Sequence, residues 1–190
     1  MDVTHRPLIV GLGGSLREIS YSRLALVEAL KMAESRGAGT ALLDLRELNL
    51  PMYVPDLQIE DYPAIHRDAV AHFAQTVYRA HALIWASPTY HGTVSGVFKN
   101  ALDMIELLGE SDPPYLTGKA VGLIAVSDSQ TFSAMAASAH ELRAWLAPVQ
   151  ITLGETDFTP ELTLKPGETT RRAGRLVSEL ISFVSTRLCV

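Results

Sequence analysis

The sequence has a single cysteine, Cys189, among its 190 residues, so one chain can form no internal disulfide bond and no cysteine-based metal site. We therefore expect a reducing compartment, and we expect Cys189 to be unreactive because a reactive thiolate needs a structured basic niche. No run approaches the roughly 18 consecutive apolar residues of a membrane span, and residues 1–7 do not resemble a secretion signal. These absences predict a cytoplasmic protein that does not enter a membrane.

Surplus positive charge is also lacking, because 16 Lys and Arg face 21 Asp and Glu, for a formal net charge of -5. General binding to nucleic acid or to an anionic membrane needs surplus cations, so we expect neither partner. The six histidines show no tight ligand spacing such as H-E-x-x-H, and we expect no metal site. Ser15 does not stand in a G-x-S-x-G motif, which disfavours a hydrolase nucleophile.

Short apolar runs alternate with amphipathic stretches along the whole chain. The runs cover residues 8–12, 41–45, 82–86, 120–126 and 149–153. They are nearly continuous in apolar residues, as parallel strands covered on both faces are. The alternation predicts one α/β domain over residues 1–190, with an open, doubly wound parallel sheet and helices on both of its faces. Ligands of such sheets bind beyond the carboxyl ends of the strands, so the loops after strands one, three and four are candidate sites.

Five amphipathic stretches between the runs have apolar residues at the i, i+3 and i+4 spacing of a helix. They cover about residues 23–35, 64–78, 97–108, 135–146 and 173–188. We expect Gly109 to end the third helix and Pro148 to end the fourth. Two long connections, residues 46–63 and 154–167, are candidate lids or contact surfaces, and we favour simple surface decoration for the second.

The loop after the first strand, residues 11–23, combines groups that bind anions. The following helix supplies free N–H groups and the positive end of its dipole, and Gly13 and Gly14 let the backbone approach a ligand closely. Arg17 adds a planar, charged fork suited to phosphate oxygens. Further hydroxyl donors come from Ser15, Ser20 and Ser22. The loop therefore predicts a site for a terminal phosphate.

Two more specific phosphate motifs are absent from this loop. Leu16 stands where the dinucleotide fingerprint G-x-G-x-x-G requires its third glycine, and no Gly-Lys-Ser/Thr ending of a P-loop is present. The alternative interpretation is local: Ser20 or Ser22 caps the helix and the glycines only turn the chain.

The loop after the third strand, residues 87–103, has the composition of a platform for a planar heterocycle. Pro88 stiffens the turn, Gly92 opens space, and backbone N–H groups are available for ring carbonyls and nitrogens. Tyr90 adds an aromatic wall, and Thr93 or Ser95 can cap the following helix. The alternative is a rigid proline turn with Tyr90 packed in the core.

These loops resemble the signatures of NAD(P)H-dependent FMN reductases of flavodoxin-like fold, over about residues 7–150. The first loop matches G-S-x-R-x-x-S-x-N at Gly14, Ser15, Arg17 and Ser20, with Ser22 in place of Asn. Residues 50–56 resemble the family's L-P-x-Y-x-x-D segment. The second loop follows S-P-x-Y-x-G-x-x-S-G-x-x-K-N-x-L-D at ten positions: Ser87, Pro88, Tyr90, Gly92, Ser95, Gly96, Lys99, Asn100, Leu102 and Asp103.

The resemblance implies a flavodoxin-like three-layer sandwich with strand order 2-1-3-4-5. It implies that the first loop binds the FMN phosphate and that residues 88–93 contact the isoalloxazine ring. The implied cofactor site consists of Gly14, Ser15, Arg17, Ser20, Ser22, Pro88, Thr89, Tyr90, His91, Gly92, Thr93 and Ser127. Many relatives carry Gly-Gly after the fourth strand, whereas residues 126–132 contain no glycine. Ser127, Ser129 or Gln130 then either binds flavin or caps the next helix, and we expect Asp128 to face solvent.

The resemblance also implies the reaction: hydride passes from NADPH or NADH to flavin and then to a small-molecule acceptor, with no catalytic acid or base required. The acceptor is free flavin that feeds a partner monooxygenase, a quinone, an azo compound or a metal oxyanion. Relatives are commonly dimers with FMN near the subunit boundary, so we expect a homodimer or homotetramer. Residues 50–56 either lie close to the site and cover its substrate face or form a proline-rich loop packed on its own subunit. The alternatives are an FMN-binding electron-transfer protein without NAD(P)H turnover, and a protein of this fold that binds another phosphate compound.

Overall fold

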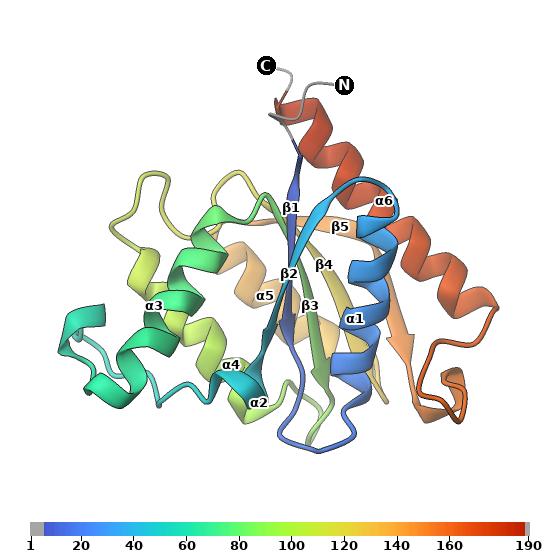
Figure 1. Cartoon of the computed structure of the whole chain (residues 1–190), viewed down its shortest axis with the longest axis horizontal. Coiled ribbons are helices and arrows are strands. Elements are labelled where there is room, and N and C mark those ends of the chain that lie inside the picture. The colour runs from blue at the N-terminus through green and yellow to red at the C-terminus, as the bar shows by residue number, and fades with distance from the viewer. Residues whose placement is uncertain (1–5, 189–190) are drawn as a thin grey trace.

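A five-stranded parallel sheet with the order β2-β1-β3-β4-β5 forms the centre of the molecule (Figure 1). The structure is a computed structural model that describes residues 6–188, so Cys189 and His5 lie outside the described residues. The strands are β1 (Leu8–Gly13), β2 (Gly39–Asp44), β3 (Ala82–Pro88), β4 (Ala120–Val126) and β5 (Trp145–Leu153). The order confirms the predicted flavodoxin-like sheet.

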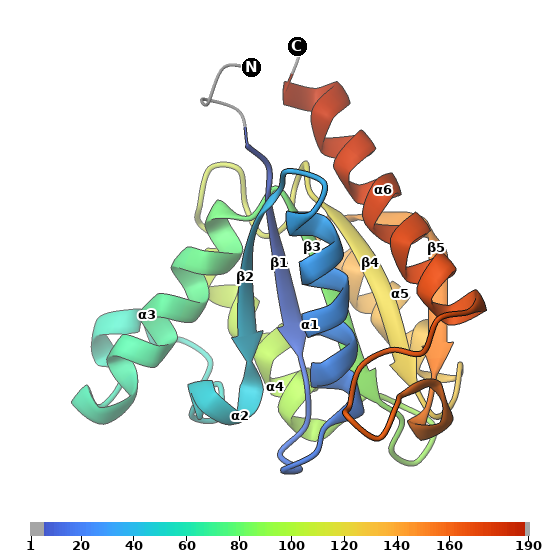
Figure 2. The ribbon, with the colours of Figure 1, turned by 45° about the vertical axis from the view of Figure 1, so that its right-hand side comes forward.

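Helices cover both faces of this sheet, as the alternating pattern predicts (Figures 1 and 2). Helices α1 (Tyr21–Glu34) and α6 (Glu168–Leu188) pack on one face. The opposite face carries α3 (Ala64–Arg79), α4 (Gly96–Asp103) and α5 (Thr131–Glu141). Short elements complete the fold: α2 (Leu45–Leu48), η2 (Ile59–Asp61), η3 (Met104–Leu108) and η4 (Glu155–Asp157). None of the helices in the described part of the chain combines the length and apolarity that crossing a bilayer requires.

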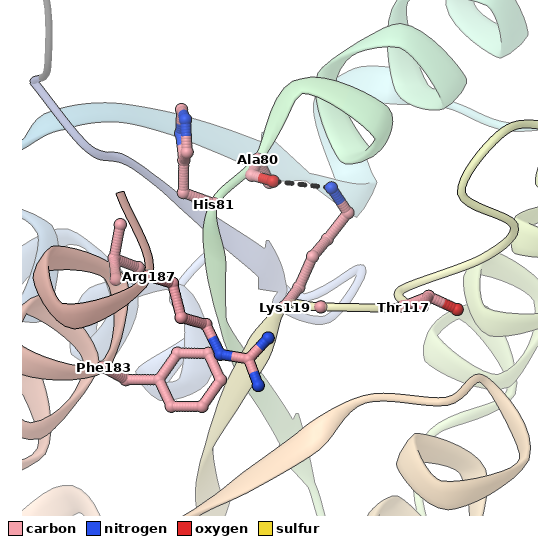
Figure 3. Close-up of a pocket in the computed structure, with 8 residues that line it drawn as sticks. Ala80, His81, Thr117, Lys119, Phe183 and Arg187 are labelled. Atoms are coloured by element: carbon pink, nitrogen blue, oxygen red, sulfur yellow. Dashed lines mark hydrogen bonds between the residues drawn. The ribbon is translucent and has the colours of Figure 1, made fainter. Parts of the chain in front are cut away.

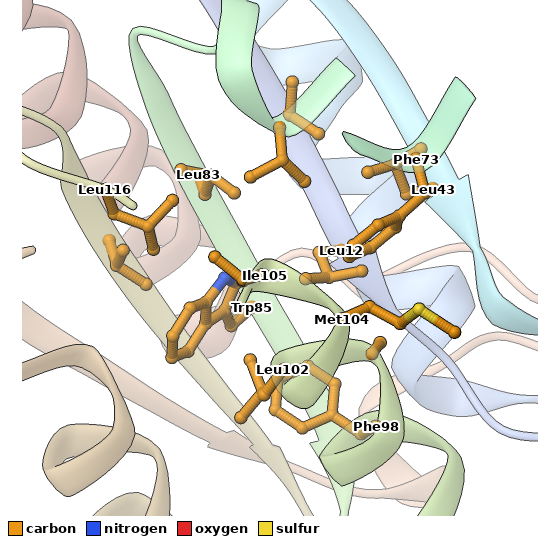
Figure 4. Close-up of a cluster of buried hydrophobic side chains, with 14 of the residues drawn as sticks. Leu12, Leu43, Phe73, Leu83, Trp85, Phe98, Leu102, Met104, Ile105 and Leu116 are labelled. Atoms are coloured by element: carbon orange, nitrogen blue, oxygen red, sulfur yellow. The ribbon is translucent and has the colours of Figure 1, made fainter. Parts of the chain in front are cut away.

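The strands bury side chains on both faces, because successive residues of a strand point in opposite directions. Ile9 and Ile84 pack against α1 and α6, whereas Leu12 and Trp85 pack into the other core (Figure 4). There the Trp85 ring meets the edge of Phe98, with ring centroids 5.9 Å apart. Two cores of this kind hold the carboxyl ends of β1, β3 and β4 in place.

The predicted helix over residues 135–146 is wrong in its second half. Helix α5 ends at Glu141, and the N–H of Ala144 donates to the carbonyl of Ala139 (2.8 Å) while Arg143 adopts a left-handed φ of 64°. This is the hydrogen-bond pattern of a Schellman C-cap, with arginine where glycine is usual. The strand therefore begins at Trp145, four residues before the predicted start.

Pro148 does not end a helix but lies inside β5, the edge strand. The β4–β5 register is interrupted between Leu146 and Gln150, so Pro148 sits where its missing N–H breaks no regular ladder bond. Gly109 follows η3 with a φ of -61°, which any residue can adopt.

The connection over residues 154–167 is more than surface decoration. Phe158 and Leu164 form an isolated bridge and are both buried against the α1–α6 side of the core. The Phe158 ring lies 5.2 Å from that of Tyr21, at the start of α1. The connection therefore packs against the end of the sheet where the candidate site lies.

Candidate functional site

A cavity of about 310 Å³ opens at the carboxyl ends of β1, β3 and β4, where the fold predicts a ligand. Its volume lies at the small end of the usual range for ligand sites, roughly 300–1,000 Å³. Eight predicted site residues line it: Ser15, Arg17, Ser20, Ser22, Pro88, Thr89, Tyr90 and Ser127. Two loops distant in sequence therefore meet around one cavity.

Three buried serines form a hydrogen-bonded chain under the β1–α1 loop, which we define as residues 14–20. Ser20 caps α1, because its Oγ accepts the N–H of Arg23 (3.3 Å). The same Oγ lies 3.2 Å from Ser15 Oγ and 3.1 Å from Ser22 Oγ. The predicted capping role is thus present, and Ser15 and Ser22 still line the cavity with hydroxyl groups.

The β1–α1 loop has more hydrogen-bond donors than the protein uses. From Ser15 to Ser22, only the N–H of Arg17 reaches an acceptor within residues 6–188, namely Ser15 Oγ at 3.4 Å. The exposed Arg17 side chain takes part in none of the salt bridges of this part of the chain. Surplus N–H groups, hydroxyls and a free guanidinium at a helix N-terminus suit an oxyanion.

Gly13 and Gly14 shape the floor of the loop. The N–H of Gly14 donates to Ala86 O (3.2 Å), which ties the end of β1 to β3. Both glycines have positive φ, 147° and 104°, and a Cβ on Gly13 would lie 2.0 Å from Ala86 O. Gly13 therefore has no room for a side chain, and Gly14 forms the turn at a φ that disfavours one. Gly14 does not line the cavity.

The second loop ends in a tight hairpin over residues 90–93. Tyr90 and Thr93 exchange backbone hydrogen bonds of 2.9 and 3.1 Å, and His91 and Gly92 have φ values of 51° and 79°. This is a type I′ turn, in which both central residues are left-handed. Its residues His91, Gly92 and Thr93 are exposed and do not line the cavity, although the N–H groups of His91 and Gly92 have no acceptor among the described residues.

Tyr90 and Thr89 have different roles on the cavity wall. Tyr90 is 38% exposed and lines the cavity, so the alternative that placed it in the core is wrong. The Thr89 hydroxyl donates to Asp128 O (2.8 Å) and lies 2.6 Å from Thr131 Oγ1. Thr89 therefore fastens the loop after β3 to the loop after β4.

Ser127 adopts a left-handed backbone conformation, which favours glycine. Its φ is 82°, and its N–H donates to Leu153 O (2.9 Å). Its exposed side chain lines the cavity. Asp128, expected to face solvent, is half-buried, and its Oδ1 accepts the N–H of Gln130 (2.9 Å) at the start of α5. The N-cap of α5 is Gln130, whose side chain makes no capping hydrogen bond, so Asp128 shapes the turn that leads into the helix and does not cap it.

Sequence reasoning missed three residues on the cavity wall: Ile19, Tyr21 and Val126. The role of Tyr21 could not be predicted from the sequence, because the residues around its side chain come from the connection over residues 154–167. Burial, and then the neighbouring Glu155 carboxylate, raise the pKa of the Tyr21 phenol. No periodicity in the sequence connects Tyr21 with Glu155.

Asn100, one of the ten residues of the second loop that match the family signature, has a structural role. Its side chain accepts the N–H of Tyr53 (2.8 Å) and donates to Pro51 O (2.9 Å), which fixes the connection over residues 46–63 to α4.

An apolar groove of about 350 Å³ lies between this connection and α4, beside the β1–α1 loop. We call it the Leu16 groove; it is lined by Leu16, Leu45, Asn49, Leu50, Met52, Gly96, Val97 and Asn100. Leu16 is 61% and Met52 is 75% exposed, an unusual degree for apolar side chains of this size.

A second cavity, of about 160 Å³, lies at the opposite end of the sheet (Figure 3). Lys119 Nζ donates to Ala80 O (2.7 Å) and Tyr78 O (2.8 Å), so it caps the carboxyl end of α3. The Leu8 N–H donates to His81 Nδ1 (3.0 Å), and burial lowers the pKa of both Lys119 and His81. These polar groups are committed to the fold. Within residues 6–188, no group of three or more His, Cys, Asp or Glu side chains is placed so that it could hold a metal ion.

Comparison with known proteins identifies a common family. Residues 7–156 match the family model described as NADPH-dependent FMN reductase. The chain is 31% identical to the NADPH-dependent FMN reductase ArsH of Rhizobium meliloti over 193 aligned positions, which cover 98% of this chain and 76% of that protein. It is 31% identical over 121 positions to an FMN-dependent NADPH-azoreductase of Staphylococcus haemolyticus, covering 60% of this chain and 61% of the relative.

Among solved structures, the fold resembles the flavoenzyme NAD(P)H:(acceptor) oxidoreductase FerB of Paracoccus denitrificans. The TM-score is 0.75 at 18% identity, over 95% of this chain and 98% of the other. This likeness supports the flavodoxin-like architecture already seen in the strand order.

Proposed function

Because this chain belongs to the NADPH-dependent FMN reductase family, we propose that the cavity at the carboxyl ends of β1, β3 and β4 holds FMN for the reduction of a small-molecule acceptor. The protein is an oxidoreductase with FMN as its cofactor and NADPH or NADH as its electron donor. When bound, FMN supplies the hydride-transfer chemistry, and the protein's part is to position and polarise it.

One observation supports this function above all: the β1–α1 loop has more hydrogen-bond donors than the described residues have acceptors for. Among the described residues, the N–H groups from Ser15 to Ser22 other than that of Arg17 have no acceptor, and the Arg17 guanidinium forms no salt bridge. Together with the hydroxyls of Ser15 and Ser22, these groups would hold the phosphate. Charge-assisted hydrogen bonds of this kind are about twice as strong as neutral ones. The residues present therefore fit a phosphate-bearing cofactor.

The second loop would support the flat ring. Pro88 and Tyr90 give the cavity an apolar and aromatic wall. The N–H groups of His91 and Gly92, next in sequence to Tyr90, have no acceptor among the described residues and are available as donors. Ser127 adds a hydroxyl from the loop after β4. We assign no catalytic acid or base, since none of these groups has to exchange a proton.

The acceptor in this proposal is free flavin, a quinone, an azo compound or a metal oxyanion. The relative named as an azoreductase supports the inclusion of azo compounds. We also propose a cytoplasmic location, which the single cysteine of the chain supports.

We also propose that the protein is a homodimer or homotetramer joined through the Leu16 groove. The groove adjoins the cavity through the β1–α1 loop, and exposed apolar surface of this kind marks interaction sites. Met52→Asp should shift sedimentation equilibrium toward the monomer. Ile65→Asp is the matched control, because Ile65 is 85% exposed but lies outside the groove. Equal oligomeric states for the parent and Met52→Asp would contradict this assignment.

An anaerobic absorbance experiment tests the function. Purified protein is mixed with FMN, freed of excess flavin, and then treated with NADPH or NADH. We expect a protein-bound flavin spectrum that one or both nucleotides bleach, followed by reoxidation with one of the acceptor classes.

Each other outcome favours a different function. Bound flavin that neither nucleotide bleaches favours an electron-transfer protein. Protein that stays colourless after addition of FMN contradicts the proposal and favours another phosphate compound as ligand.

A further inference from the structure

An ion pair between Arg23 and Asp44 lies against the backbone of the β1–α1 loop. Asp44 ends β2 in register with Gly13, and its Oδ2 accepts a hydrogen bond from Arg23 Nε. Its Oδ1 accepts the N–H of Arg46 (3.0 Å). A methyl group on Gly14 would lie 3.6 Å from Asp44 Oδ1, 3.7 Å from Arg23 Cβ and 4.0 Å from Ser20 Oγ. A carboxylate is thus packed beneath the residues proposed to hold a phosphate.

This arrangement places a negative charge where an anion-binding site would not be expected to have one. The Asp44 side chain is only 6% exposed, so solvent screens it weakly. Two negative charges a few ångströms apart repel strongly when water is excluded. Arg23 is the one basic side chain that forms a salt bridge with Asp44 in residues 6–188.

We propose that Arg23 is a positioning residue that neutralises Asp44, so that the β1–α1 loop can hold the doubly negative phosphate of FMN. The inference rests on the proposed function. Arg23 acts through Asp44: its guanidinium is engaged by the carboxylate, its N–H is bound by Ser20 Oγ, and it does not line the cavity. Arg17 supplies the direct positive charge.

A purely structural role for the pair predicts a different result. If the pair only ties α1 to the end of β2, removing either partner loosens the loop and weakens binding of any flavin. If the pair balances charge, removing Asp44 alone strengthens phosphate binding, because Arg23 is then left with an uncompensated positive charge. Asp44→Asn separates the two, since asparagine keeps an oxygen for the Arg46 N–H.

The test measures dissociation constants of FMN and riboflavin for the apoprotein by flavin fluorescence. Riboflavin is the matched ligand because it lacks the phosphate. At low salt we expect Asp44→Asn to bind FMN about three- to tenfold more tightly and Arg23→Gln about tenfold more weakly, by Coulomb energies across a partly screened site. The double variant Arg23→Gln/Asp44→Asn should return to within about threefold of the parent, as coupled sites do. Riboflavin affinity should be unchanged throughout.

Clear outcomes overturn the inference. FMN binding that is unchanged or weaker in Asp44→Asn refutes charge balancing, as does equal weakening of FMN and riboflavin in Arg23→Gln. If Arg23→Gln does not fold, Asp44→Asn and the double variant still give the answer. Failure of the parent to bind FMN contradicts the proposed function instead, so the two failures are distinguishable.

Discussion

Gly13→Ala tests how closely the end of β1 must approach β3 to form the floor of the site. The new Cβ would lie 2.0 Å from Ala86 O and 2.9 Å from Ala86 C, so the two strands would have to separate. Overpacking of this kind costs about 1–3 kcal/mol. The φ of 147° adds a further ~1–3 kcal/mol for a residue with a side chain. We therefore expect the free energy of unfolding to fall by roughly 2–6 kcal/mol, less about 0.4–1 kcal/mol gained from a stiffer unfolded chain.

Urea unfolding of the apoprotein measures this change, followed by tryptophan fluorescence, to which buried Trp85 in β3 and exposed Trp145 in β5 contribute. Gly39→Ala is the matched control, because Gly39 opens β2 and its Cβ would lie 3.7 Å from the nearest atom, Pro7 O. The control should change stability by less than about 1 kcal/mol, as compatible Gly→Ala changes do. If Gly13→Ala is as stable as Gly39→Ala, the close approach of β1 to β3 is not required and our account of the floor is wrong.

Three further predictions concern the cavity and the opposite end of the sheet. Arg17→Ala should weaken FMN binding by about 1.5–3 kcal/mol, because it removes a charge-assisted phosphate contact, and should leave riboflavin affinity unchanged. If the variant binds FMN as tightly as the parent, the phosphate does not bind at Arg17. Ser127→Gly should raise the melting temperature by about 1–4 °C, since glycine relieves a φ of 82° worth about 1–2 kcal/mol, less about 0.4–1 kcal/mol for a more flexible unfolded chain. A lower melting temperature would show that the Ser127 backbone is not strained. Burial, and then Lys119, lower the pKa of His81 below 6.5, so the folded protein binds a proton less readily than the unfolded chain. Stability is therefore fully present above about pH 6.5 and falls as the pH drops toward the folded pKa. His81→Asn, which keeps an acceptor for the Leu8 N–H, should show a shallower fall in urea unfolding between pH 7 and 5, and equal slopes would contradict it.

The sheet could be predicted because its strands are buried on both faces. An apolar run such as residues 120–126 has few competing interpretations, and β4 covers those residues in the structure. The order β2-β1-β3-β4-β5 followed from the family resemblance, because alternation alone does not specify which strands are neighbours.

The misread boundary at Trp145 has a local cause. Met135, Ala139, Leu142 and Leu146 continue a helical spacing, but Arg143 takes the left-handed C-cap conformation in place of the glycine that would have marked the end. Propensity rules do not place arginine there, so the start of β5 was hidden.

The candidate site was predictable where local motifs define it and not where distant segments meet. Ser15, Arg17 and Ser20 belong to one loop, and that loop does border the cavity. Tyr21 gains its environment from Phe158 and Glu155, and Asp44 reaches the β1–α1 loop through strand pairing. Such long-range contacts leave no periodic signal in one sequence.

A structure of the protein crystallised with FMN tests the central claim most directly. We predict the phosphate within hydrogen-bond distance of Ser15, Ser22 and the Arg17 guanidinium, with the ring against Pro88 and Tyr90. A phosphate bound elsewhere, or a flavin ring away from residues 88–93, would contradict the account of this site.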